Sequence, residues 1–129
     1  MKNILVADNL VKTYTQTQGF FSRTKNTIHA LNQVSINIES GKTLAVVGES
    51  GSGKSTLARS LIKLINIDEG TIIFDGIDLN AINNAQLKVV RRDIQMVFQD
   101  PYASLNPRMR IKDILEEPLA VSYTHLTLP

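Results

Sequence analysis

The chain has 129 residues, of which 43% are hydrophobic, and a formal net charge of +2, values that suit one small globular domain with a real core. A net charge this small gives no argument for nucleic acid as a partner. The lack of cysteine excludes disulfides and thiolate metal sites. The sequence has no apolar run of membrane-spanning length and no signal-peptide core at its start, so we expect any membrane role to come through a partner.

The first forty residues predict two strands and a loop. Residues 4–14 mix apolar and polar side chains as strands do, and residues 16–27 form a polar stretch that predicts an exposed loop. Apolar and polar side chains then alternate over residues 34–39, which predicts a half-buried strand. Residues 40–42, Ser-Gly-Lys, predict a turn.

The most informative stretch follows this turn. Residues 43–47, TLAVV, predict a short buried strand, and residues 48–56, GESGSGKST, fit the phosphate-binding pattern G-x-x-x-x-G-K-[ST]. Leu57, Leu61 and Ile65 then recur at helical spacing. A plain glycine-rich turn before a helix is the alternative interpretation. Strand, glycine loop and helix in this order favour a site for the phosphates of a nucleotide.

Each residue type in the loop suits a triphosphate. Glycine adopts positive φ and has no Cβ, so successive N–H groups can turn inward around an anion, and a helix N-terminus adds further donors. The glycines of the loop are Gly48, Gly51 and Gly53. Lys54 supplies a positive charge toward the β- and γ-phosphates. Ser55 offers a hydroxyl to Mg²⁺, and Thr56 can hydrogen-bond the α-phosphate.

The remainder of the chain predicts shorter elements. Gly70 follows the predicted helix and suits a C-cap or a turn. Residues 71–74 predict a strand that ends in the hairpin dipeptide Asp75-Gly76. Farther on, residues 94–98 predict another short buried strand.

A helix is predicted near the end of the chain. Residues 101–107 predict a loop, and residues 111–119 have a helical pattern that Pro118 is expected to disrupt. The sequence has no internal repeats.

Three segments together carry a resemblance to a family: GESGSGKST, the segment MVFQDPYASLNPR from Met96 to Arg108, and Tyr14. The chain resembles the ATP-binding subunits of ATP-binding-cassette (ABC) transporters, and within them the oligopeptide/dipeptide importer group. The similar region extends from Leu10 to about Leu119. The resemblance implies ATP and Mg²⁺ as cofactors.

The resemblance also implies the fold. It predicts an α/β P-loop NTPase nucleotide-binding domain of the ABC type, of which residues 1–120 are the N-terminal portion. That portion holds RecA-like core strands, an antiparallel β subdomain and the start of a helical subdomain. Residues 121–129 depart from the family, and we expect them to be a non-native tail.

The family's site residues carry over to matching positions. Gln99 matches the Q-loop glutamine, which reaches Mg²⁺ and the attacking water, and Tyr14 matches the aromatic side chain that stacks on adenine. Residues 100–108, with Tyr102 and Leu105, match the region that meets the transmembrane subunit. The ATP-binding set implied is Tyr14, Gly48, Glu49, Ser50, Gly51, Ser52, Gly53, Lys54, Ser55, Thr56 and Gln99. Ser55 and Gln99 are the implied Mg²⁺ ligands.

Family members also need an LSGGQ-type signature, a Walker B strand ending in Asp-Glu, and a later histidine. No LSGGQ-like string is found in the 129 residues. The stretch Ile72 to Asp75 imitates Walker B, but Gly76 stands where the catalytic glutamate is needed, so a hairpin turn explains it better. His29 and His125 do not match the switch histidine. We therefore assign no catalytic residue and expect these residues alone to be poorly folded and to lack ATPase activity.

The implied function is an ATPase subunit that energises import of peptides or a similar solute. It would act at the cytoplasmic face of the membrane with permease subunits and a second nucleotide-binding subunit, identical or different, and indirectly with a solute-binding protein. Peptide, glutathione-like and nickel importers share these motifs. A soluble P-loop kinase or GTPase is a weaker alternative, since no NKxD-type guanine motif is found. A non-catalytic nucleotide-binding regulator is the other alternative.

Overall fold

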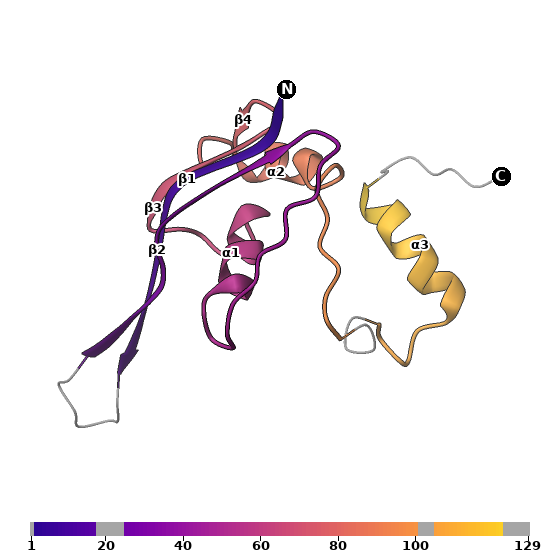
Figure 1. The fold of residues 1–129 in the computed structure, drawn as a ribbon. Coiled ribbons are helices and arrows are strands. Elements are labelled where there is room, and N and C mark those ends of the chain that lie inside the picture. The colour runs from indigo at the N-terminus through magenta and orange to yellow at the C-terminus, as the bar shows by residue number, and fades with distance from the viewer. Residues whose placement is uncertain (1, 18–24, 101–104, 123–129) are drawn as a thin grey trace. The chain divides into compact units, whose positions relative to one another are not determined.

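The structure is a computed structural model that describes residues 2–17, 25–100 and 105–122. It divides into two compact units, Met1–Lys88 and Val89–Pro129, and each is described by itself below. The first unit contains the sheet, the glycine loop and the helix that follows the loop (Figure 1).

The first unit is built on a four-stranded antiparallel sheet with the order β2-β1-β3-β4. Its long strands are β1 (Asn3–Thr17) and β2 (Lys25–Glu39), and its short ones are β3 (Glu69–Phe74) and β4 (Ile77–Asp78). Since β1 pairs with β2 on one edge and β3 on the other, it organises the sheet (Figure 1). The predicted strands at 4–14 and 34–39 are confirmed, and both extend into the predicted loop at 16–27.

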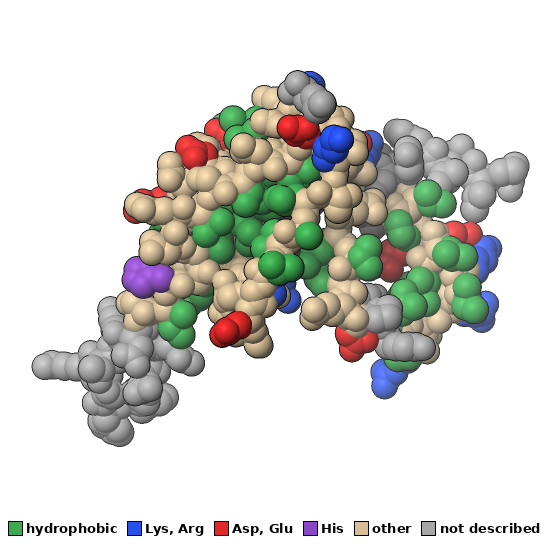
Figure 2. All heavy atoms as spheres, viewed as in Figure 1, with side chains coloured by type: hydrophobic (Ala, Val, Ile, Leu, Met, Phe, Trp, Pro, Cys, Tyr) green, Lys and Arg blue, Asp and Glu red, His purple; other side chains and the backbone are tan. Residues whose placement is uncertain are grey.

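Burial follows the alternation of side chains along the strands. In β2, Val34, Ile36 and Ile38 are half-buried while Ser35 and Asn37 are exposed, as the sequence predicts. Helix α1 (Lys54–Leu61) follows the glycine loop and contacts β2. The buried core of this unit consists of Leu5, Ala7, Leu10, Leu31, Leu57, Ile72 and Leu79. Hydrophobic side chains also reach the surface in the middle of this unit (Figure 2).

The hairpin predicted at Asp75-Gly76 is confirmed. Phe74 of β3 pairs with Ile77 of β4, and the two residues between them have φ of 44° and 83°. Positive φ at both central positions is the geometry of a type I′ turn, which Asp-Gly suits. Asp75 is therefore a turn residue of the hairpin, and its carboxylate lies 2.7 Å from the ammonium of Lys2.

Gly70 has a different place from the one predicted. It lies inside β3, opposite the point where β1 changes register between Asp8 and Val11, and its φ is 102°. A Cβ on Gly70 would lie 2.6 Å from the carbonyl oxygens of both Asp8 and Asn9. The glycine thus serves a strand irregularity and not a helix C-cap, because the two strands approach too closely there for a side chain.

Both predicted buried strands at 43–47 and 94–98 are wrong. The segments have no strand partner within the described residues, and Val47 and Val97 are 90% and 95% exposed. An apolar run becomes a buried strand only when neighbours pair its edges and cover its faces. These segments carry the composition of a buried strand without those neighbours.

The helices differ from the predictions at their ends. α1 ends at Leu61, four residues before the predicted end at Ile65, and Lys63 has a left-handed φ of 55°. The short α2 (Asn84–Val90) was not predicted. It begins with a capping box in which Asn83 and Gln86 each accept the other's backbone N–H at 3.0 Å.

In the second unit, α3 (Ile111–Ser122) continues through Pro118, so the expectation that this proline ends the helix is wrong. Proline removes one N–H and crowds the preceding turn, but the helical bonds on either side can hold a helix of this length together.

Candidate functional site

The glycine loop runs over residues 48–53 and leads directly into α1. Gly53 is the N-cap residue, with a left-handed φ of 91°, and the helix begins at Lys54. The first N–H groups of a helix have no intrahelical acceptor, so α1 presents donors and the positive end of its dipole at the loop. Ser55 is exposed and Thr56 is half-buried in this first turn.

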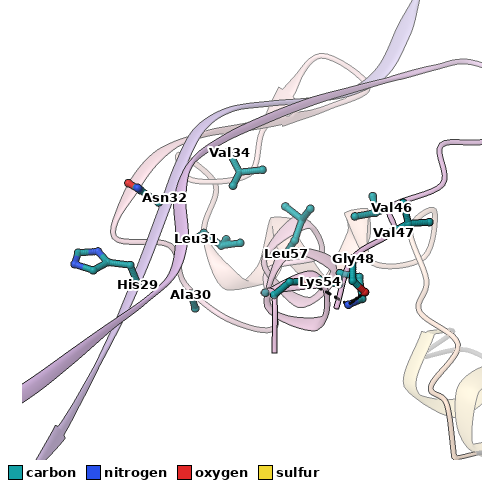
Figure 3. A pocket seen from close by; sticks show the side chains of 12 residues that line it. His29, Ala30, Leu31, Asn32, Val34, Val46, Val47, Gly48, Lys54 and Leu57 are labelled. Carbon is teal, nitrogen blue, oxygen red and sulfur yellow. Dashed lines mark hydrogen bonds between the residues drawn. The ribbon is translucent and has the colours of Figure 1, made fainter. Parts of the chain in front are cut away.

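Lys54 directs its ammonium back across the loop. Its Nζ donates to the carbonyl oxygen of Gly48 at 2.7 Å (Figure 3). It also donates to the carbonyl oxygen of Glu49 at 2.5 Å and to the Ser52 hydroxyl at 3.2 Å. A turn bond from the Ser52 N–H to the Glu49 carbonyl, at 3.3 Å, closes the same stretch. The loop is thus wrapped around one positive charge, the Lys54 ammonium, which its own oxygen atoms hold in place.

The loop is set against the edge of the sheet. A cavity of about 410 Å³ lies beside it, between β2, the segment before the loop and the start of α1 (Figure 3). Its walls are largely apolar, with Leu31, Val34, Val46 and Leu57, while Lys54 and the loop glycines form its polar side. Apolar walls beside a few convergent polar groups are typical of small-molecule sites.

Tyr14 lies in β1, opposite Ile28 of β2, and is 39% exposed. The ammonium of Lys12 stands 5.6 Å from the centroid of its ring, within the range of a cation–π contact. A partly exposed, flat ring held on a sheet suits stacking against a base.

Gln99 lies in the second unit, in an irregular stretch, and is exposed. The structure does not place it relative to the glycine loop, so its pairing with Ser55 around Mg²⁺ stays a prediction. Of the predicted docking region, Leu105 is 50% exposed, and Tyr102 lies outside the described residues.

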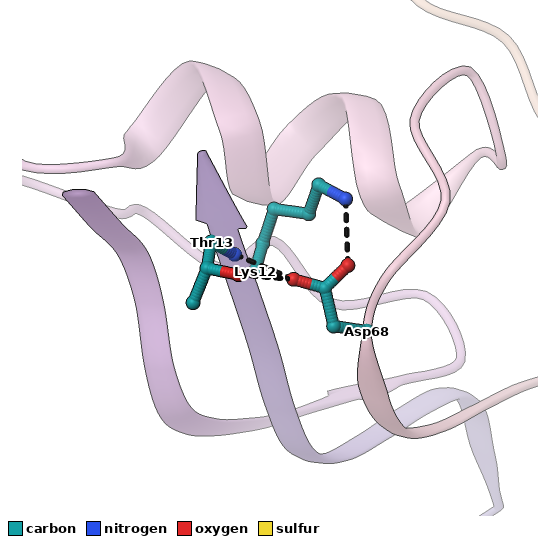
Figure 4. A network of polar contacts seen from close by, with 3 residues as sticks. All are labelled: Lys12, Thr13 and Asp68. Carbon is teal, nitrogen blue, oxygen red and sulfur yellow. Dashed lines mark hydrogen bonds and ion pairs between the residues drawn. The ribbon is translucent and has the colours of Figure 1, made fainter. Parts of the chain in front are cut away.

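Sequence patterns missed one charged network near the site (Figure 4). Asp68 accepts hydrogen bonds from the Lys12 ammonium at 2.8 Å, the Thr13 N–H at 2.7 Å and the Thr13 hydroxyl at 2.8 Å. The bond from Lys12, followed by those from Thr13, lowers the pKa of Asp68 from 3.8 to about 2. No local pattern reveals this contact, since 55 residues separate Asp68 from Thr13.

Within the described part of the chain, no three or more Asp, Glu, His or Cys side chains gather as a metal site. Among the same residues, none of the helices has the length and apolar character needed to cross a bilayer.

Glycine loop, ammonium and helix N-terminus together define a phosphate-loop protein. The sequence profile described as ABC transporter matches residues 31–125. The chain belongs to the ABC transporter family.

Relatives agree with this assignment. The glutathione import ATP-binding protein GsiA of Escherichia coli (strain K12) is 45% identical over 118 residues, which is 92% of this chain. The protein of the same name from Shigella dysenteriae serotype 1 (strain Sd197) has the same identity and coverage. The chain spans 19% of the length of these relatives.

Solved structures agree on the fold. The dimeric post-hydrolysis state of the ATP-binding cassette MJ0796, bound to ADP and Pi, superposes with a TM-score of 0.76 at 32% identity, over 96% of this chain and 50% of that one. A second dimeric structure of MJ0796, a bacterial ABC transporter cassette, gives 0.75 at 33% identity, over 92% of this chain and 48% of that one. The predicted ABC-type nucleotide-binding fold is therefore confirmed.

Proposed function

We propose that the chain is the ATP-binding portion of an ABC importer subunit that energises uptake of peptides or a related small solute. The observation that carries this proposal is the glycine loop closed around the Lys54 ammonium at the start of α1. The 45% identity to a protein named for glutathione import supports the importer assignment.

The loop residues would hold the triphosphate. Lys54 exchanges its carbonyl acceptors for β- and γ-phosphate oxygens, and the N–H groups of the loop and the first helical turn donate to the same anion. Gly53 suits this role because a Cβ there would enter the space of the neighbouring β2 backbone. The exposed Ser55 hydroxyl would bind Mg²⁺, which supplies charge neutralisation at the phosphates.

Tyr14 would stack on the adenine, and Gln99 would contribute its amide oxygen to Mg²⁺ and the attacking water. The rest of the implied ATP-binding set comprises Gly48, Glu49, Ser50, Gly51, Ser52 and Thr56. No group among the 129 residues is assigned to activate water, so we expect nucleotide binding from this chain without turnover.

The proposed partners are a second nucleotide-binding subunit and permease subunits, with the protein at the cytoplasmic face of the membrane. Dimeric cassettes among the similar structures support the first partner. Exposed apolar side chains in the second unit support the second: Leu105 is 50% exposed, Ile111 77% and Leu115 67%. Ile111 and Leu115 are four residues apart in α3 and so share one helix face.

Because we expect these residues alone to fold poorly, the test is equilibrium binding of Mg-ATP to the folded monomer fraction of the chain, isolated by size-exclusion chromatography. The variants are Lys54→Ala and the matched control Lys42→Ala. Lys42 is an exposed lysine just before the loop segment. We expect saturable binding that Lys54→Ala weakens at least about tenfold, because a charge-assisted phosphate contact is lost, while Lys42→Ala stays near the parent. Equal affinities for the two variants would contradict the proposed site.

A further inference from the structure

On the edge of β1 that faces β3, the backbone groups just before Tyr14 are no longer paired with β3. The ladder between the two strands ends at the pair Val11 and Glu69. Beyond it, Asp68 takes over: its own N–H donates to the Val11 carbonyl at 2.8 Å, and its carboxylate accepts the Thr13 N–H at 2.7 Å. One residue therefore satisfies two backbone groups that a longer β3 would have paired.

The same carboxylate holds Lys12. The Lys12 ammonium lies 2.8 Å from Asp68, and the side chain is only 16% exposed, whereas Lys2 in the comparable pair with Asp75 is 75% exposed. This restrained ammonium stands 5.6 Å from the centroid of the Tyr14 ring. The contacts form one chain from Asp68 through Lys12 to the aromatic ring.

The backbone ladder with β2 is irregular at this part of β1, so it does not by itself set the position of Lys12 and Thr13. The register between β1 and β2 shifts on both sides of Lys12, between Leu10 and Lys12 and again between Lys12 and Thr13. Asp68 bonds to both residues of the second shift, and so determines how the strand emerges at Tyr14.

We propose that Asp68 is a positioning residue for base recognition, which fixes the Tyr14 ring through Lys12 and Thr13. Lys12 lies against the ring, and the exposed part of the ring is left for a purine base. Asp68 lies at the end of the short segment that connects α1 to β3. Its bonds to β1 therefore link the helix that begins at the phosphate loop to the strand that carries Tyr14. The inference rests on the proposed function, in which Tyr14 stacks on the base.

The test separates base from phosphate recognition by comparing two probes, Mg-ATP and magnesium tripolyphosphate, in equilibrium binding to the chain. The variants are Asp68→Asn and Lys12→Met, with Tyr14→Ala to report loss of the base contact itself. The matched controls are Asp75→Asn and Lys2→Met, which break the other Asp–Lys pair of the sheet at 2.7 Å.

We expect Asp68→Asn and Lys12→Met to weaken Mg-ATP binding about 3- to 10-fold, the scale of a cation–π contact and the ring placement it supports. Tripolyphosphate affinity should change less than about twofold, because the phosphate loop is intact. Lys12→Arg should retain ATP affinity, since a guanidinium can keep both the ion pair and the ring contact. The two controls should match the parent for both probes.

Equal weakening of both probes would show that Asp68 acts on general folding and would overturn the inference, as would unchanged ATP affinity in Lys12→Met. Lys12→Met leaves the bonds from Thr13 to Asp68 in place, so it decides the matter even where Asp68→Asn fails to fold. A parent chain that binds neither probe would instead refute the proposed function together with the inference.

Discussion

Gly53 lies so close to Ala30 that a Cβ built on it would clash with the Ala30 carbonyl oxygen. The contact joins the last residue of the phosphate loop to the backbone of β2. The φ of Gly53, 91°, is in addition one that side chains rarely adopt. The sheet therefore sets the position of the loop.

Replacing Gly53 by alanine should displace the loop from β2, because the clash is with backbone and cannot be relieved by a side-chain rotation. We expect Gly53→Ala to weaken Mg-ATP binding by at least about tenfold and to lower stability by more than the roughly 1–2 kcal/mol of left-handed strain alone. Gly51→Ala is the matched control, since Gly51 also has positive φ, 81°, but open space around it. Calorimetric titration and urea unfolding measure both effects, and equal losses in the two variants would contradict the role of Ala30.

Gly70 and Gly76 allow the same comparison of a crowded and an open glycine within the sheet. Gly70→Ala would place a Cβ 2.6 Å from two carbonyl oxygens of β1, whereas Gly76→Ala at the hairpin turn meets only open space. Both positions have positive φ. We expect Gly76→Ala to cost about 1–2 kcal/mol and Gly70→Ala clearly more. The difference in urea midpoint is the measurement, and Gly70→Ala as mild as Gly76→Ala would refute the close approach.

Ser60 is fully buried in α1, and its hydroxyl has no hydrogen-bond partner. A buried hydroxyl without a partner is destabilising, so Ser60→Ala should leave stability unchanged or raise it by up to about 2 kcal/mol. Ser35 offers the contrast, because its hydroxyl accepts the Asn9 N–H at 2.9 Å and donates to Asp8 at 3.0 Å. Ser35→Ala should lower stability by about 1 kcal/mol. Thermal melts of both variants check this, and a melting midpoint lowered as far in Ser60→Ala as in Ser35→Ala would contradict it.

Acid should weaken the sheet through Asp68. Its pKa falls from 3.8 to about 2 in the folded protein, so the ionised carboxylate stabilises the fold above about pH 4. That stabilisation is lost as the pH falls from about 4 toward 2. Unfolding midpoints across this range should drop less steeply in Asp68→Asn than in the parent. An equally steep drop in Asp68→Asn would contradict this role of Asp68.

The apolar segment before the loop should promote self-association. Leu44, Val46 and Val47 are 44%, 48% and 90% exposed, and the segment pairs with no strand among the described residues. Unpaired apolar edges attract other chains. We expect Val47→Lys to reduce light scattering of the 129-residue chain and Thr43→Lys, at the start of the same segment, to do so less. Scattering that is the same in parent and Val47→Lys would exclude this segment as the cause.

Local patterns predicted the features whose physics is local. Alternation along residues 34–39 predicted the faces of β2, and the dipeptide Asp75-Gly76 predicted its turn. The glycines within residues 48–56 predicted a loop ahead of a helix. Each depends on residues within a few positions of one another, so a single sequence contains the necessary information.

The features that were predicted wrongly or not at all depend on residues far apart in the sequence. For Gly70 the sequence predicts a C-cap or a turn, because positive φ serves helix ends, turns and strand irregularities alike. Only the distant carbonyls of Asp8 and Asn9 distinguish them. Residues 43–47 have the composition of a buried strand, but burial depends on neighbours that the composition does not contain. Asp68 was missed because its partner Thr13 lies 55 residues away.

β2 and β3 both pair with β1, so the connection between them, residues 40–68, is a loop whose two ends are fastened to one strand. Fastening its second end has an entropic cost that depends only weakly on length. A nucleotide that binds only the closed form would offset that cost by mass action. Binding at the loop would therefore slow hydrogen exchange at Ile72, in the strand that completes the closure.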